Sequence, residues 1–253
     1  DVSLTSKLGK GGFGTVYAGV RLCDKAPVAV KFVYSKAVWK WHVTDKGERI
    51  PIEIHTLNRV RHVRGVVRLY DWFAVSDGYI MIMERPINYV SLDKYCREGR
   101  TLTEAQSIHV FQQLVKIVYE CWLQCGILHC DIKDDNVLIN REDLSVRLID
   151  FDFAIEHSQR PRKTHAGTPF FAPPEWHIRK RYYPESLVVW TLGVVLFRLI
   201  FSQHPFRHLS EIKTFVHVKT LETFREISNK ALSDLLASML TRLPQTRPGL
   251  DAI

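Results

Sequence analysis

One short stretch of this sequence constrains the fold more than any other: two apolar strands, NVLIN and VRLIDF, joined by the turn REDLS. Polar side chains flank this predicted hairpin, in residues 129–136 before the first strand and at Asp150 after the second. The outer ends of a hairpin lie side by side, so these polar groups must gather in one place. The fold must therefore hold several charged groups around one hairpin. We interpret His129 and Phe151, which lie among these groups, as packing residues.

Four of the polar side chains supply what the transfer of a phosphoryl group requires. Asp131 can accept and orient the proton of an incoming hydroxyl, and Lys133 can neutralise charge on the transferred group. Asn136 and Asp150 offer the hard oxygen ligands that Mg²⁺ prefers. The other interpretation, a solvated acidic turn, does not require all four residues in this order. The hairpin is therefore the candidate catalytic and metal-binding region.

A second feature is the glycine-rich stretch GKGGFGTV at residues 9–16, between two predicted strands. Glycines would let backbone amides approach phosphate oxygens closely, because no Cβ intervenes. The pattern is weak by itself, since glycine-rich hairpins that bind nothing are common. A dinucleotide-binding fold is disfavoured because no helix is predicted to follow.

A third feature is the apolar strand VAVK, which ends with Lys31. A lysine that points inward from a strand needs a counter-charge. Glu53, on the helix predicted at residues 51–60, could hold its ammonium group against the phosphates of a nucleotide. The alternative is a surface lysine on an edge strand. The first interpretation predicts an ion pair between the sheet and the helix.

The pattern of apolar residues divides the chain in two. Up to Met83, short alternating runs separated by glycine and charged turns predict an antiparallel sheet, with the helix at 51–60 inserted. Beyond it, helical spacing dominates. Thr103 and Gln106 predict a capping box at the start of a long helix, and Gly126 stands where that helix would end. The chain is therefore predicted to be an α+β protein, with a small sheet lobe and a larger, mainly helical lobe.

The boundaries follow from the same pattern. We expect one domain over residues 1–253, with the small lobe at 1–83, a hinge and linker at 84–91, and the helical lobe at 92–253. The longest apolar run, residues 187–197, falls short of the roughly 20 residues that cross a bilayer. We predict that it is a buried helix.

Net charge and cysteine content limit which binding partners and which cellular location we expect. The net charge of +8 would suit nucleic acid or an anionic membrane, but the basic residues are spread along the chain and no RNA-binding motif accompanies them. We therefore expect neither partner, and we expect a monomer. The five cysteines form no metal-binding pattern. We interpret them as reduced thiols of an intracellular protein, in the cytoplasm or the nucleus.

Together these features resemble a eukaryotic protein kinase over nearly the whole sequence. More narrowly, the chain is similar to the Pim serine/threonine kinases in the stretches ERIPIEIHTL, VVRLYDWF, ERP, HCDIKDDN, LIDF and PPEW. The resemblance implies the bilobal kinase fold, ATP and Mg²⁺ as cofactors, and transfer of the γ-phosphoryl group of ATP to proteins. It assigns ATP contacts to Leu8, Gly9, Lys10, Gly11, Gly12, Phe13, Gly14, Val16, Ala29, Lys31, Glu53, Met83, Glu84 and Pro86.

The resemblance also gives roles to single residues. Pro86 in the hinge has no N–H, so adenine would lose one backbone donor. The carbonyl of Glu84 would then be its main polar anchor, beside Met83. The segment PPE would position the substrate, with Arg247 as the buried partner of Glu175.

The expected substrates are serine or threonine residues of proteins, near basic residues. Lys133 and Thr168 match serine/threonine kinases better than tyrosine kinases. Asp134 and Asp135, beside the candidate base, could favour basic residues near the target hydroxyl; the alternative is that Asp135 only caps the loop. A small-molecule kinase is disfavoured because Lys133 and the segment GTPFFAPPE suit a peptide groove.

Three positions depart from the kinase pattern. Asp152 replaces a glycine, Cys130 replaces an arginine, and Val188 replaces a buried aspartate that Pim kinases also lack. Asp152 adds a carboxylate near the metal site, which puts the catalytic rate in question. Asp152 and Cys130 support one alternative, a pseudokinase that binds nucleotide or acts as a scaffold without turnover. The retained lysine, base and metal ligands argue against it.

Overall fold

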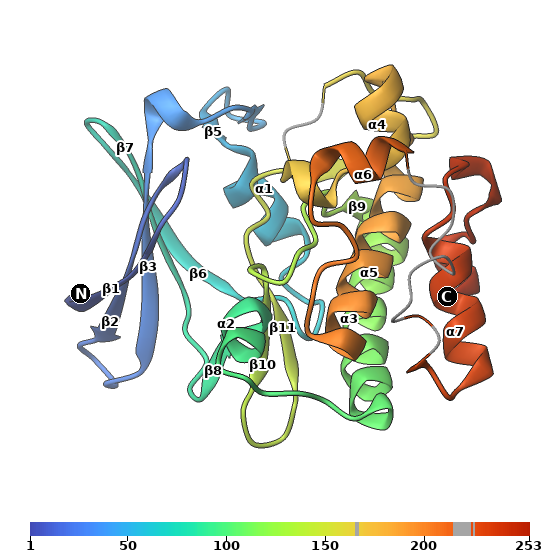
Figure 1. Cartoon of the computed structure of the whole chain (residues 1–253). Coiled ribbons are helices and arrows are strands. Elements are labelled where there is room, and N and C mark those ends of the chain that lie inside the picture. The colour runs from blue at the N-terminus through green and yellow to red at the C-terminus, as the bar shows by residue number, and fades with distance from the viewer. Residues whose placement is uncertain (165–166, 215–223, 225) are drawn as a thin grey trace.

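The structure is a computed structural model of the 253-residue chain, and it describes residues 1–164, 167–214, 224 and 226–253 (Figure 1). Its first part is an antiparallel sheet with the strand order β1-β2-β3-β7-β6. These strands are β1 (Val2–Lys10), β2 (Gly14–Arg21), β3 (Pro27–Tyr34), β6 (Leu69–Val75) and β7 (Gly78–Glu84). The inner strands are rich in β-branched residues, which suit a pleated, half-buried surface. The predicted sheet lobe is confirmed.

One helix is inserted into this sheet. After β3 and the 3-10 turn Ser35–Ala37, the chain forms the short hairpin of β4 (Trp41–Val43) and β5 (Arg49–Pro51), and then helix α1 (Ile52–Arg59). Pro51 directly precedes the first helical residue, where a missing N–H removes no helical hydrogen bond. α1 buries Ile54 and Leu57, which lie one turn apart on its inner face. The helix predicted at residues 51–60 is confirmed.

The second part is built on two long helices, α3 (Glu104–Cys125) and α5 (Pro184–Phe201), which pack against each other (Figure 1). Thr103 and Gln106 exchange side chain to backbone hydrogen bonds of 3.0 and 3.2 Å, so the predicted capping box is present. Gly126 ends α3 with a left-handed φ of 64°. The shorter helices are α2 (Leu92–Arg97), α4 (Pro174–Arg179), α6 (Leu209–Thr214) and α7 (Lys230–Met239), with 3-10 turns at Pro169–Phe171, Pro244–Thr246 and Leu250–Ala252.

α5 is the core helix of this lobe. Its length and composition would also suit a membrane crossing, but 78% of the helix is buried inside the protein. A helix that is apolar on all sides is expected in this position. Val188 on α5 is fully buried among apolar side chains. The apolar run of residues 187–197 is therefore a buried helix, as predicted.

The predicted hairpin forms from β10 (Val137–Asn140) and β11 (Val146–Leu148). A third strand, β8 (Tyr89–Ser91), pairs with β10; it is too short for the sequence pattern to mark it. Beyond the polar segments, β9 (Ile127–Leu128) pairs with β12 (Ile155–Glu156). The loop before β10 and the loop after β11 are thus held side by side at both of their ends.

A buried ion pair fastens α4 to the C-terminal part of this lobe. Two guanidinium nitrogens of Arg247 each donate to one carboxylate oxygen of Glu175, both at 2.8 Å. Arg247 also donates to the backbone carbonyls of Thr241 and Ser186, so little of its hydrogen-bonding capacity is lost on burial. This is the partner predicted for Glu175.

Arg247→Ala is expected to lower the free energy of unfolding by about 3–5 kcal/mol, because it leaves the buried carboxylate of Glu175 without its counter-charge. Urea unfolding followed by tryptophan fluorescence measures the change. Arg242→Ala is the matched control: Arg242 is exposed, and its removal should cost less than about 0.5 kcal/mol. Equal losses in the two variants would contradict the importance given to this pair.

Candidate functional site

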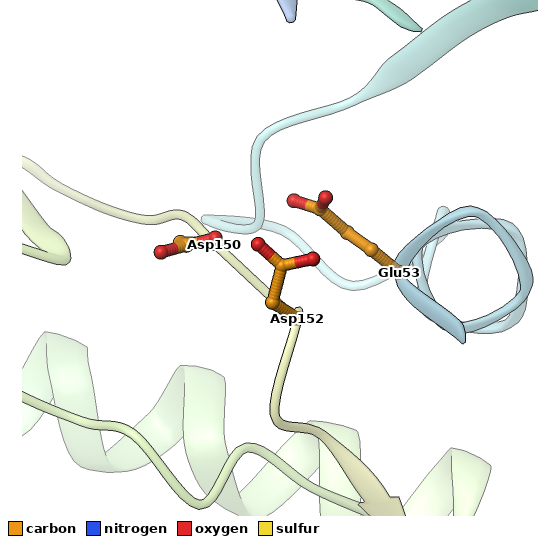
Figure 2. A group of neighbouring side chains, drawn as sticks. All are labelled: Glu53, Asp150 and Asp152. Carbon is orange, nitrogen blue, oxygen red and sulfur yellow. The ribbon is translucent and has the colours of Figure 1, made fainter. Parts of the chain in front are cut away.

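Lys31, in the middle of β3, is the centre of the candidate site. Its Nζ atom lies 2.7 Å from Oε2 of Glu53 on α1, so the predicted ion pair between sheet and helix is present. On the loop after β11 it also lies 2.9 Å from Oδ1 of Asp150 and 2.7 Å from Oδ2 of Asp152. Figure 2 shows the three carboxylates converging from the helix and from this loop. One ammonium group therefore joins three separate segments of the chain.

The carboxylates around Lys31 outnumber its single ammonium group. Burial by itself would lower the pKa of Lys31, but the three carboxylates outweigh it and raise this pKa well above its usual range. Burial raises the pKa of Asp152, and the charge of Glu53 raises it further. Burial also acts on Asp150, but Lys31 outweighs it and holds the pKa of Asp150 below its usual range. Of these two aspartates, Asp152 is the one that binds a proton more readily.

The loop before β10 holds the candidate base. Oδ1 of Asp131 accepts hydrogen bonds from the backbone N–H of Thr168 at 2.9 Å and from the Thr168 hydroxyl at 3.1 Å. Oδ2 of Asp131 accepts one from Asn136 at 3.1 Å and lies 3.1 Å from Nζ of Lys133. Lys133 in turn donates to the Thr168 hydroxyl at 2.8 Å. The structure thus brings Asp131, Lys133 and Asn136 together, with the Thr168 hydroxyl between Asp131 and Lys133.

Two residues of this region have strained backbones. Cys130 and Asp150 have φ values of 60° and 65°, a region that non-glycine residues seldom adopt.

His129 is buried, and one of its ring nitrogens lies 3.0 Å from the carbonyl of Ile149. Its ring packs edge-on against Phe151 at 4.6 Å, and burial lowers the pKa of His129. His129 and Phe151 are therefore packing residues, as interpreted from the sequence.

The glycine-rich turn joins β1 to β2. A side chain at Gly14 would collide with the backbone oxygen of Phe32 on β3, so packing requires glycine there. At Gly9, Gly11 and Gly12, an added Cβ would meet nothing within 4 Å. Packing therefore does not explain these three glycines. The backbone N–H of Gly11 donates to the carbonyl of Gly14 at 3.0 Å. That the glycines let a phosphate approach backbone N–H groups stays a prediction.

Phe13, at the tip of this turn, belongs to an aromatic cluster that the sequence pattern did not predict. The centroid of its ring lies 5.1 Å from that of the Phe153 ring, and the ring centroids of Phe153 and Trp39 are 5.6 Å apart. Nε1 of Trp39 donates to the backbone carbonyl of Asp152 at 2.5 Å. The glycine-rich turn is thereby fastened to the segment that carries Asp152.

The other residues assigned to ATP lie along the strands of the small lobe. Leu8 and Lys10 are exposed on β1, and Val16 is half-buried on β2. Ala29 and Met83 are buried and lie directly opposite each other on β3 and β7.

The hinge residues follow at the end of β7. Glu84 is the last residue of that strand, and Pro86 is half-buried two positions further on. The backbone N–H of Glu84 donates to Arg68 at 2.8 Å, so this donor is already in use. That the carbonyl of Glu84 anchors adenine, beside Met83, stays a prediction.

The acidic residues fit a divalent cation such as Mg²⁺. One oxygen from each of Glu53, Asp150 and Asp152 lies within 4.8 Å of the others (Figure 2). Hard oxygen donors are what Mg²⁺ prefers, and three carboxylates around one ammonium group attract a cation. Asn136 and Asp150 remain the predicted ligands. Asp152 adds a carboxylate that the kinase pattern does not have.

The prediction that Asp134 could favour basic residues near the target hydroxyl is wrong. Asp134 is buried, with Oδ2 lying 3.0 Å from Nε of Arg198 on α5 and 3.5 Å from Nε2 of His204. Arg198 therefore holds the loop of residues 129–136 from α5, the helix on which Val188 replaces the buried aspartate of the kinase pattern. Asp135 is exposed and stays available to a substrate.

Comparisons with known proteins agree with this geometry. A family model described as "Protein kinase domain" matches residues 2–253. Serine/threonine-protein kinase prk-2 of Caenorhabditis elegans is 36% identical over 253 residues, which are 100% of this chain and 57% of that protein. Serine/threonine-protein kinase pim-2 of Danio rerio is 31% identical over 256 residues, which are 97% of this chain and 80% of that protein. The predicted resemblance to Pim kinases is confirmed.

Other relatives are much longer than this chain. The PAS domain-containing serine/threonine-protein kinase of Mus musculus is 32% identical over 254 residues, which are 98% of this chain but 18% of that protein. This chain therefore matches only the kinase portion of that longer protein.

Asp152→Asn is expected to raise the free energy of unfolding at pH 7 by on the order of 1 kcal/mol. A raised pKa means that Asp152 holds its proton more tightly in the folded than in the unfolded chain. The parent therefore loses stability as the pH rises above the ordinary aspartate pKa, about 4, and the variant escapes this loss. The difference should shrink as the pH falls through about 4.

Urea unfolding at several pH values measures this difference. Asp45→Asn, at an exposed position between β4 and β5, is the control and should change stability by less than about 0.5 kcal/mol. A variant at Asp152 that is less stable than the parent at pH 7 would mean that the contact with Lys31 outweighs the crowding of carboxylates.

Proposed function

The chain belongs to the protein kinase family, and from this premise we propose that it transfers the γ-phosphoryl group of ATP to serine or threonine hydroxyls of proteins. Relatives named serine/threonine-protein kinases match it over almost its whole length, which supports the proposal. The observation that carries it is the hydroxyl group held between Asp131 and Lys133.

The hydroxyl of Thr168 indicates how an acceptor would be bound. It donates to the carboxylate of Asp131 at 3.1 Å and accepts from the ammonium of Lys133 at 2.8 Å. A general base must lie within hydrogen-bond distance of the proton that it removes. A substrate hydroxyl in these surroundings would be oriented by Asp131, while Lys133 would stabilise negative charge on the transferred group.

Lys31 is the proposed anchor for the phosphates of ATP. Its three ammonium hydrogens are all engaged by carboxylates, so a phosphate oxygen must replace one of these contacts. Asp152 is the candidate to leave, because its raised pKa favours the neutral form. When bound, Mg²⁺ supplies charge neutralisation for the phosphates, and Asn136 and Asp150 are the residues that would hold it.

Asp131→Asn is expected to lower kcat about 10³-fold, because the amide cannot accept the hydroxyl proton. The affinity for ATP should change less than about threefold, because Asp131 does not contact the proposed phosphate anchor. Transfer to an arginine-rich peptide with one serine, and ATP binding by calorimetry, are the two measurements. Asp45→Asn is the control. Full transfer in the Asp131 variant would contradict the assigned base.

The preference for basic substrates rests on Asp135 alone, since Asp134 is engaged by Arg198. Asp135→Asn is expected to raise KM for the arginine-rich peptide about fivefold, because an exposed charge pair is modest in strength. KM for a peptide with glutamine in place of arginine should not change. Peptide kinetics with serine, threonine and tyrosine acceptors complete the test, and we expect transfer to serine and threonine. Equal KM values for both peptides in the parent would remove the basic preference.

A second candidate function is a nucleotide-binding scaffold without turnover. The contact between Asp152 and Lys31 favours it, because this carboxylate competes with ATP for the same ammonium group. The kinetics above separate the two functions. A scaffold would bind ATP and give no phosphopeptide with any acceptor.

A further inference from the structure

Two basic segments lie against each other on the surface of the helical lobe. The first, RPRK, covers residues 160–163, and the second, RKR, covers residues 179–181 at the end of α4. The backbones of Arg162 and Tyr182 exchange hydrogen bonds of 2.8 and 3.1 Å as an antiparallel bridge. Lys163 directly follows Arg162 and Arg181 directly precedes Tyr182, so the bridge holds both cations next to the paired residues. We call the five exposed cations of these segments the basic ridge: Arg160, Lys163, Arg179, Lys180 and Arg181.

The charge of the basic ridge is not compensated. In the part of the chain that the structure describes, no carboxylate lies within 4.0 Å of any of the five cationic groups. The acidic residues nearest in sequence are engaged elsewhere, Glu156 with Arg59, Glu175 with Arg247 and Glu185 with the backbone of Leu250. Five like charges in so small a region repel one another unless an anion binds.

The shape of the basic ridge is fixed by its supports. Lys180 closes α4 in a left-handed conformation with a φ of 50°, and its ammonium lies 5.1 Å from the centre of the Trp176 ring. The bridge at Arg162 and Tyr182 holds the other segment in place. A surface that is already ordered loses little conformational entropy when a partner binds.

The bridge that carries the basic ridge lies close to the proposed acceptor position, because Arg162 and Tyr182 line one small cavity with Cys130 and Gly167, the neighbours of Asp131 and Thr168. Thr168, which contacts Asp131 and Lys133, is followed directly by the 3-10 turn Pro169–Phe171 and then by α4, which ends at the ridge. A ring nitrogen of His177 on α4 lies 2.9 Å from the carbonyl of Pro169, which ties the helix to this turn. Six helical residues span only about 9 Å. A peptide bound at Asp131 could therefore reach the ridge with a few more residues.

We propose that the basic ridge binds an acidic stretch of the protein substrate, formed by aspartate, glutamate or phosphorylated residues, at a distance from the target serine or threonine. This rests on the kinase activity proposed above and adds a second determinant to it. Asp135 would attract basic residues close to the target hydroxyl, and the ridge would attract acidic residues beyond them. The preferred substrate is then a segment with both signs of charge.

A peptide is favoured over nucleic acid as the partner for two reasons. The basic ridge lies beside the acceptor position, where a protein substrate must already bind. Single-stranded nucleic acids also need aromatic rings on which bases can stack, and the ring of Trp176 at the ridge is already in contact with Lys180.

The test compares three peptides that share one serine and its arginines. One has four glutamates added after a flexible spacer, one has four glutamines in their place, and one has no extension; each extension is made on either side of the serine. We expect the glutamate peptide, in one of the two orientations, to have a KM about fivefold below that of the glutamine peptide, with equal kcat. About 0.5 M NaCl should remove the difference, because salt screens exposed charges.

The variant Arg179→Ser/Arg181→Ser should lose this advantage and keep the kinetics of the glutamine peptide. The matched control is Arg61→Ser/Arg64→Ser, which removes two exposed arginines between α1 and β6 and should keep the advantage. Thermal unfolding checks that both variants are folded. Equal KM values for the glutamate and glutamine peptides in the parent, or the same loss in the control variant, would overturn the proposal.

A binding measurement separates failure of the basic ridge from failure of the kinase activity. Fluorescence anisotropy of a labelled glutamate peptide, with alanine in place of serine, needs no turnover. If no peptide is phosphorylated but the glutamate peptide still binds through Arg179 and Arg181, the kinase proposal fails and the ridge stands. If a single-stranded DNA 12-mer binds through these arginines and the glutamate peptide does not, the ridge proposal is overturned in favour of nucleic acid.

Discussion

The contact of one ammonium group with three carboxylates is the interaction on which the rest of the site depends. Lys31 belongs to the sheet, Glu53 to the inserted helix, and Asp150 and Asp152 to the loop of the helical lobe. No other described contact joins these three segments through one atom. The glycine-rich turn is attached to the same loop, because Phe13 and Trp39 pack on the segment that carries Asp152.

The same contact explains why the site should bind a charged ligand. Three carboxylates around one ammonium group leave an excess of negative charge, which burial makes costly and which a divalent cation would relieve. A phosphate can approach Lys31 only if one carboxylate leaves. We propose that Asp152 thereby competes with a nucleotide for Lys31, which a glycine at this position could not do.

Much of the fold and part of the site could be predicted from the sequence, where local chemistry decides. The capping box at Thr103, the C-cap at Gly126 and the hairpin of β10 and β11 depend on a few neighbouring residues. The ion pair between Lys31 and Glu53 was predictable because an inward lysine needs a counter-charge, and that between Arg247 and Glu175 because family resemblance supplies a partner distant in sequence. The role of Asp134 was not, because its partner Arg198 is on α5 and no local pattern links the two. The aromatic cluster at Phe13 and the bridge at Arg162 were missed for the same reason.

The most direct test of this account is calorimetric titration of the nucleotide-free chain with MgATP, compared with Lys31→Met. The variant keeps the volume of the side chain and removes its charge, so it tests the ammonium group itself. We predict that the parent binds MgATP and that the variant binds it at least about tenfold more weakly. Equal affinity in the two proteins, or no binding by the parent, would contradict the claim that these groups converge around a bound triphosphate.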